Sequence, residues 1–245
     1  MRRVMKEEFY VGYSAKAPPS LARFVARTSA CLLLTGTVIA AVLVFGQRPF
    51  ANSKFEYGVV RPYEGVLESR PYPVLVTDDA RYLLVAPGKH GFMAYGFEGR
   101  RVKLDGSLIQ RGSDAMLEVG HVVEASGANG ASSTLDLGPV TLAGEIVDSK
   151  CYLGVMNPGD GKVHRDCATR CISGGIPPAF VVRDTAGESR TLLLAGEDGR
   201  ALRAEVLDFV AEPVELSGQL SRVGSTLVLH ANVSRGIKRI ARRIP

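Results

Sequence analysis

An internal repeat constrains the fold of this chain more than any other feature of its sequence. Seven residues of one apolar stretch recur at a constant offset of 112 positions. They are Val102, Leu104, Gly106, Leu108, Gly112, Ser113 and Leu117, matched by Val214, Leu216, Gly218, Leu220, Gly224, Ser225 and Leu229. Each copy has the pattern of a strand with one apolar face, a glycine-centred turn and a returning strand. The chain is therefore expected to use one β-unit twice.

Matches upstream of this stretch extend the repeat and reveal an insertion. The paired segments are 81–85 with 190–194 at an offset of 109, 73–76 with 178–181 at 105, and 68–72 with 148–152 at 80. The change from 80 to 105 predicts that the second copy carries 25 additional residues between its first and second strands. This insertion, residues 151–176, contains every cysteine outside the apolar N-terminal run.

The length of each copy predicts the fold class. About five short strands in roughly 90 to 110 residues, closed by a strand-turn-strand, are typical of a small antiparallel barrel of the OB type, with a compact sandwich as the alternative. The chain is thus predicted to be mainly β, with a single N-terminal transmembrane helix followed by two tandem OB-like barrels. The boundaries are 47–137 for the first barrel and 138–234 for the second, which carries the helical Cys/His insertion.

An uncharged run near the N-terminus predicts a membrane anchor. Thr28–Phe45 comprises 18 residues without a charge, and as a helix it would span about 27 Å, enough for a bilayer core. We predict a transmembrane helix over 28–46, with Cys31 facing lipid or another helix. A cleaved signal peptide is the alternative, although the run is longer and begins later than such a segment requires. Either interpretation exports the rest of the chain.

The distribution of charge supports this topology and argues against a nucleic-acid partner. The net charge of +5 divides into +4 over residues 1–27, +5 over the basic tail 235–245, and −4 over everything between. The positive-inside rule then places the N-terminus in the cytoplasm and the bulk of the chain in the periplasm, as a single-pass protein of the inner membrane. In the tail, Ile237, Ile240 and Ile244 have helical spacing, which suits contact with lipid or with a partner; a solvated, frayed terminus is the equal alternative.

The insertion contains a cluster of candidate metal ligands. His164, Cys167 and Cys171 stand at i, i+3 and i+7, so a helix from about Val163 to Ser173 would place them on one face. Cys151 follows the first strand and would approach this face. Three thiolates and one imidazole form a tetrahedral set for zinc, and their sulfur donors also suit iron. We predict a metal site, zinc or iron, formed by Cys151, His164, Cys167 and Cys171.

Two other interpretations of these cysteines remain open from the sequence. In an oxidising compartment, Cys151 could form a disulfide with Cys167 or Cys171. The remaining thiol, beside a histidine, would then be either inert or reactive. A separate segment, Gly88-Lys89-His90-Gly91, has the composition of a turn, with an anion-holding loop as its alternative.

The cluster also carries a resemblance to a known group of proteins. Asp148-x-x-Cys151, His164-x-x-Cys167-Ala168-x-x-Cys171 and Gly175-x-Pro177 resemble a pattern of exported bacterial OB-like domains whose activity is largely unassigned. The resemblance covers residues 144–194. It implies an extracytoplasmic β-barrel whose Cys and His residues form its distinctive site, and it implies no reaction.

These observations lead to an expected function. Ser-His-Asp order, nucleotide-binding loops and zinc-protease motifs are absent from the sequence, so an accessory role is expected rather than an enzyme activity. We expect a membrane-anchored, periplasmic, metal-binding accessory subunit of a membrane redox or assembly system, within a membrane protein complex. The alternatives are a periplasmic thiol/disulfide-active protein and a disulfide-stapled interaction module without chemistry of its own.

Overall fold

The N-terminal unit is a long apolar helix. The computed structural model describes residues 17–46, 52–127, 132–185 and 187–241, and its two compact units, 1–49 and 50–245, are described in turn. Helix α1 runs from Pro19 to Gly46, buries none of its residues and is long and apolar enough to cross a membrane. It begins nine residues before the predicted anchor, because proline is well accommodated in the first turn of a helix.

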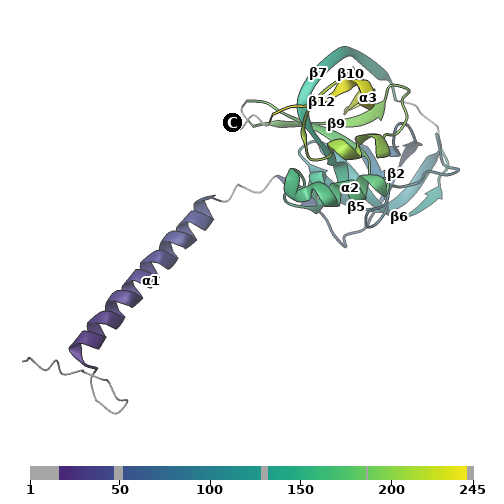
Figure 1. Cartoon of the computed structure of the whole chain (residues 1–245). Coiled ribbons are helices and arrows are strands. Elements are labelled where there is room, and N and C mark those ends of the chain that lie inside the picture. Colours follow the sequence, from purple (N-terminus) through teal and green to yellow (C-terminus); the bar gives the residue numbers. More distant parts are fainter. Residues whose placement is uncertain (1–16, 47–51, 128–131, 186, 242–245) are drawn as a thin grey trace, which may run out of the picture. The chain divides into compact units, whose positions relative to one another are not determined.

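The second unit begins with a five-stranded barrel built from the first copy of the repeat (Figure 1). Its strands are β2 (Arg61–Glu68), β3 (Val74–Val76), β4 (Arg81–Val85), β5 (Arg101–Arg111) and β6 (Asp114–Glu124), and the short strand β1 (Ser53–Phe55) adds to β5. The order β5-β2-β3-β4-β6 closes because β6 also pairs with β5. Strand β4 runs parallel to β6, and the other pairs are antiparallel.

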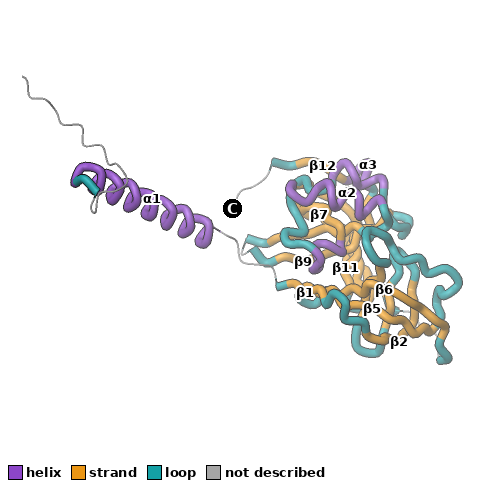
Figure 2. The backbone as a smooth tube through the Cα atoms, turned by 90° about the horizontal axis from the view of Figure 1, so that it is seen from below, coloured by secondary structure: helices purple, strands orange, loops and turns teal. Residues whose placement is uncertain are grey.

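The second copy repeats this topology. Its strands are β7 (Thr134–Asp148), β8 (Pro178–Arg183), β9 (Ser189–Gly196), β10 (Pro213–Val223) and β11 (Thr226–Ala231), with β12 (Ile237–Arg239) added to β10. The pairing of β11 with β10 closes the ring, and β9 runs parallel to β11. In both barrels the third strand pairs with the fifth and the fourth with the first, as in an OB barrel. The predicted fold class is confirmed, and strands dominate the second unit (Figure 2).

The barrel interiors test the register of the repeat. Leu104 and Leu117 fill the first interior where Leu216 and Leu229 fill the second, so the offset of 112 is correct. The offsets of 80 and 109 are each wrong by one position. Pairing aligns Leu67 with Ile146 at an offset of 79, and residues 82–84 with 192–194 at 110. Residues 82–84 and 192–194 are largely apolar in succession, so the pattern alone did not show which face points inward. The match at 80 used residues at and beyond the ends of β2 and β7, where strand alternation gives no register.

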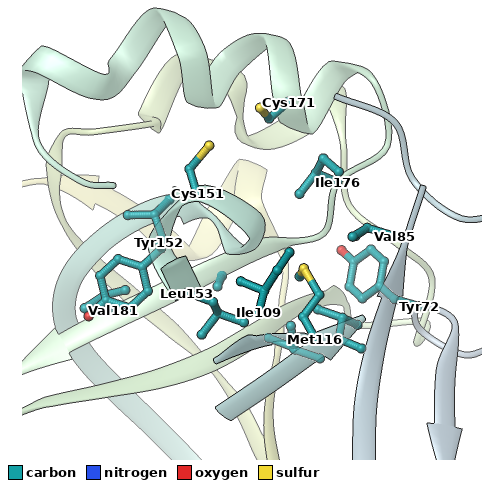
Figure 3. Close-up of a cluster of buried hydrophobic side chains, with 14 of the residues drawn as sticks. Tyr72, Val85, Ile109, Met116, Cys151, Tyr152, Leu153, Cys171, Ile176 and Val181 are labelled. Carbon is teal, nitrogen blue, oxygen red and sulfur yellow. The ribbon is translucent and has the colours of Figure 1, made fainter. Parts of the chain in front are cut away.

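The two barrels share an additional core between them. It contains the same positions of both copies, namely Val74, Leu83 and Met116 from the first and Ala179, Leu193 and Val228 from the second. The interface therefore has the self-complementary character of a twofold dimer. Figure 3 shows side chains of both barrels in this one cluster. Tyr72 extends it, because its hydroxyl donates to the carbonyl of Leu194 at 2.6 Å and accepts from the amide of Leu202 at 3.0 Å.

The insertion and the C-terminus complete the second unit. Between β7 and β8 the chain forms a π-helical turn (Cys151–Val155), a 3₁₀ turn (Lys162–His164) and helix α2 (Arg165–Ser173). Near the C-terminus, a 3₁₀ turn (Ala204–Phe209) precedes β10, and the short helix α3 (Val233–Gly236) precedes β12. The helical interpretation of the tail is wrong at Ile237, which lies in β12 opposite Leu216, and Ile244 is outside the described residues.

Candidate metal centre

Three segments of the insertion bring the predicted ligands together. Cys151 opens the π-helical turn, His164 ends the 3₁₀ turn, and Cys167 and Cys171 lie on α2. The predicted helix is confirmed from residue 165, and its first predicted turn is 3₁₀. Cys171 points from α2 toward the turn that carries Cys151 (Figure 3). The break at Gly174, which ends α2, returns the chain to β8.

The candidate ligand atoms form two overlapping groups. Those of Cys151, His164 and Cys167 all lie within 4.8 Å of one another, and so do those of Asp148, Cys151 and Cys171. Cys151 belongs to both groups and is therefore the centre of the cluster. The four predicted ligands are thus linked through Cys151, while Cys171 is grouped with Asp148 and not with His164 and Cys167.

Asp148 is a member of the site that the ligand prediction omitted. It is fully buried at the end of β7, its Oδ2 lies 3.0 Å from Nε2 of His164, and its Oδ1 accepts the amide hydrogen of Cys151 at 2.8 Å. With both oxygens engaged, Asp148 is suited to orienting the ligands rather than binding metal itself. A carboxylate on one ring nitrogen leaves Nδ1 of His164 for a metal, as in many metal sites. In the sequence, Asp148 was recognisable only as part of the motif Asp148-x-x-Cys151.

A lysine from the first barrel reaches the thiols. Lys89 lies in the loop after β4, and its Nζ is 2.9 Å from Sγ of Cys167 and 3.5 Å from Sγ of Cys171. Residues Gly88–Gly91 were predicted to form a turn, with an anion-holding loop as the alternative, and the groups that the lysine of this turn contacts are thiols. Sequence reasoning could not have paired Lys89 with Cys167, because they belong to different copies of the repeat.

The loop that carries Lys89 is fixed to the insertion by further contacts. Lys150 is buried, donates to the carbonyls of Ala86 at 3.0 Å and Gly88 at 2.7 Å, and forms an ion pair with Glu118 at 2.5 Å. On the other side of the loop, the amide of Gly91 donates to the carbonyl of Gly174 at 3.0 Å. The position of Lys89 is therefore determined by the packing of one barrel on the other.

The electrostatics of the site favour a thiolate at Cys171. A hydrogen bond from the Cys151 thiol and the nearby Lys89 ammonium lower the pKa of Cys171 to about 7. The same hydrogen bond, together with burial, raises the pKa of Cys151, so this thiol keeps its proton. The hydrogen bond to Cys167 raises the pKa of Lys89. In the metal-free site, the Lys89 ammonium therefore lies beside the pair Cys151 and Cys171, of which Cys171 ionises first.

Burial distinguishes the members of the site. Cys151, His164 and Cys171 are buried, whereas Cys167 is partly exposed, so solvent reaches the site on the Cys167 side. All four cysteines of the chain are free thiols in the structure, with Cys31 exposed on α1. A disulfide within the insertion is therefore not present in this state.

The donor set is chemically consistent with a soft or borderline metal ion. Three sulfurs and one imidazole nitrogen match closed zinc and iron sites. When all three thiolates bind a divalent ion, the site carries one negative charge, which the ammonium of Lys89 offsets. Comparison with known proteins gives no further assignment, since no protein-family model, curated protein or solved structure matches the chain.

Proposed function

We propose that this protein is a membrane-anchored periplasmic accessory subunit that binds one metal ion, zinc or iron, for a membrane redox or assembly system. The observation that carries the proposal is that Cys151 belongs to two groups of candidate ligands, one with His164 and Cys167 and one with Asp148 and Cys171, and within each group the ligand atoms lie within 4.8 Å of one another. The apolar helix and the charge distribution support the location.

The residues around the ligands have separate tasks in this proposal. Asp148 orients two ligands: its carboxylate hydrogen-bonds to Nε2 of His164 and accepts the backbone amide hydrogen of Cys151. Lys89 balances the charge of the thiolates and donates hydrogen bonds to two sulfurs. Four protein ligands close the coordination sphere, so the bound metal would supply a structural link or an electron-transfer centre rather than a hydrolytic one.

A thiol/disulfide-active protein is the second candidate, favoured by the low pKa of Cys171. Thiolates near neutral pH are the attacking groups of disulfide exchange. Access argues against it, because Cys171 is 1% exposed and Cys151 is 4% exposed. A substrate disulfide would meet Cys167 first. The third candidate, a stapled interaction module, requires a disulfide that the structure does not contain.

Metal content and thiol reactivity separate the three candidates. The full-length protein, purified in detergent without added chelator, is expected to contain about one equivalent of zinc or iron by elemental mass spectrometry. Cys167→Ser should lose most of this metal, whereas Cys31→Ser, which alters a cysteine on α1, should keep it. Metal-free Cys31→Ser protein with one rapidly reacting thiol would instead support disulfide exchange. Metal-free Cys31→Ser protein with one disulfide and an inert thiol would leave only the interaction module.

A further inference from the structure

A small cavity lies where equivalent turns of the two copies meet. Its volume is about 50 Å³, and its lining includes Ser113 and Ser225, which occupy the same position in the repeat. Leu83 and Leu193, another equivalent pair, form part of its apolar wall. The cavity is thus a product of the twofold packing of the barrels and is separate from the thiols of the metal site.

The polar lining of the cavity differs between the copies. Arg81 on β4 and Asp114 on β6 are two positions before the paired residues Leu83 and Met116, so they lie side by side on parallel strands. The equivalent positions in the second barrel are Thr191 and Thr226, which also line the cavity. One wall therefore presents both a cation and a carboxyl, and the opposite wall presents two hydroxyls.

Two buried polar atoms at this cavity have no hydrogen-bond partner in the described part of the chain. They are Nε of Arg81 and Oγ of Ser149. The Arg81 side chain is 8% exposed and Ser149 is 1% exposed, so both are withdrawn from bulk solvent. The other nitrogens of Arg81 are engaged, Nη2 with Glu68 at 2.8 Å and Nη1 with Ser132. Leaving a buried donor unpaired costs roughly 1 to 3 kcal/mol, which a bound molecule would recover.

Asp114 provides an acceptor at the same cavity. Thr191 hydrogen-bonds to its carboxyl, and burial raises the pKa of Asp114. Arg81 is paired with Glu68 instead of Asp114. A hydrogen-bond donor on a ligand would therefore stabilise the ionised carboxylate of Asp114, which burial destabilises.

We propose that this cavity binds a small zwitterionic α-amino acid of the size of glycine or alanine. Its carboxylate would accept from Nε of Arg81 and from the hydroxyl of Ser149, and its ammonium would donate to Asp114. A cavity with about 50 Å³ of space for the centres of water-sized groups holds roughly three to five such groups at about 10 to 15 Å³ each, which suits the five non-hydrogen atoms of glycine. A simple carboxylate would place a second anion beside Asp114, and a simple ammonium would leave Nε of Arg81 without an acceptor. A molecule with both charges satisfies both sides.

Three matched probes test the proposal on the full-length protein in detergent. Glycine, acetate and methylammonium carry both charges, only the anion and only the cation, and each is titrated at pH 7 and constant ionic strength while backbone amide resonances are recorded. Glycine is expected to shift resonances near residues 113–115 and 225–226 saturably, and the other two are expected to bind at least about tenfold more weakly. Equal binding of acetate would replace the proposal with a plain anion site. No saturable shift with glycine would show that the cavity holds water only.

Variants assign the binding to the cavity. Asp114→Asn and Arg81→Lys should each weaken glycine binding by about tenfold or more, since each removes a charged or directional partner. Arg100→Lys is the matched control, because Arg100 forms an exposed pair with Glu124 on the same barrel. The melting temperature and the metal content of each variant identify misfolding and loss of the metal site separately. Unchanged binding in both cavity variants with native melting would overturn the proposal.

Discussion

At the scale of single residues, the site combines the four predicted ligands with two partners of different origin. Asp148 comes from the strand that precedes Cys151, and its spacing made it recognisable. Lys89 comes from the other barrel, 78 residues from Cys167 along the chain. The ligands therefore follow from local spacing, whereas the charge that balances them follows from tertiary packing.

The role of Lys89 leads to a prediction for metal affinity. Lys89→Met removes the hydrogen bonds to Cys167 and Cys171, so metal affinity should fall by about 10- to 100-fold, as is usual for groups that support metal ligands. Lys89→Arg keeps the charge and should lose less. Competition with a chelator of known affinity measures the change. Lys103→Met, at an exposed position of β5, is the control, and unchanged affinity in Lys89→Met would refute the role.

The thiol pair leads to a prediction for pH dependence in the metal-free protein. The pKa of Cys171 is lowered from 9.0 to about 7, so ultraviolet thiolate absorbance should show one ionisation near pH 7. Cys171→Ser should abolish it. Because the folded-state pKa is the lower one, the associated stability is present above pH 9 and is lost as the pH falls through 7. An ionisation that remains in Cys171→Ser would assign the thiolate to another cysteine.

At the scale of elements, the sequence predicted the two barrels, the insertion and most of α2. The alternation of apolar and polar residues and the repeat were sufficient to predict the barrels, because alternate residues of a barrel strand point inward. Two offsets were wrong by one position, since β9 is buried on nearly all successive residues and the other match used residues at and beyond the ends of β2 and β7. Continuous apolar runs of this kind indicate strands covered on both faces. That signal pointed to the shared core between the barrels.

The close approach of the Lys89 loop to the insertion leads to a third prediction. A Cβ on Gly91 would lie 2.3 Å from the backbone oxygen of Gly175, so Gly91→Ala should force the two segments apart. We expect a loss of about 1 to 3 kcal/mol in the free energy of unfolding, together with weaker metal binding. Gly120→Ala is the control, because its Cβ would meet only Asp105 O at 3.9 Å. Urea denaturation compares them, and equal stabilities would contradict the described contact.

At the scale of the whole molecule, the first barrel is a structural partner of the site. It supplies Lys89, and it buries the turn that carries Cys151 through the core that both barrels share. Repetition in the sequence predicted two similar barrels but contained no information on how they pack, because contacts between copies are not periodic along the chain. The self-complementary interface explains why equivalent residues meet at one cavity.

The shared core leads to a prediction for unfolding of the described barrels. Tyr72 and Lys150 connect the copies by buried hydrogen bonds, so neither barrel is expected to unfold while the other stays native. Calorimetry of the full-length protein in detergent should show a single transition for the barrels, with equal calorimetric and van't Hoff enthalpies. Two resolved transitions, one of them unaffected by Gly91→Ala, would show that the barrels are independent.

In the proposed site, residues of both barrels surround one metal ion held by three thiolates and one imidazole. X-ray absorption spectroscopy of the full-length protein measures this coordination directly. We expect about three sulfur ligands near 2.3 Å and one nitrogen near 2.0 Å, with the sulfur count falling by one in Cys167→Ser protein loaded with the same metal. A metal coordinated only by nitrogen and oxygen, or protein purified and reconstituted without stoichiometric metal, would contradict it.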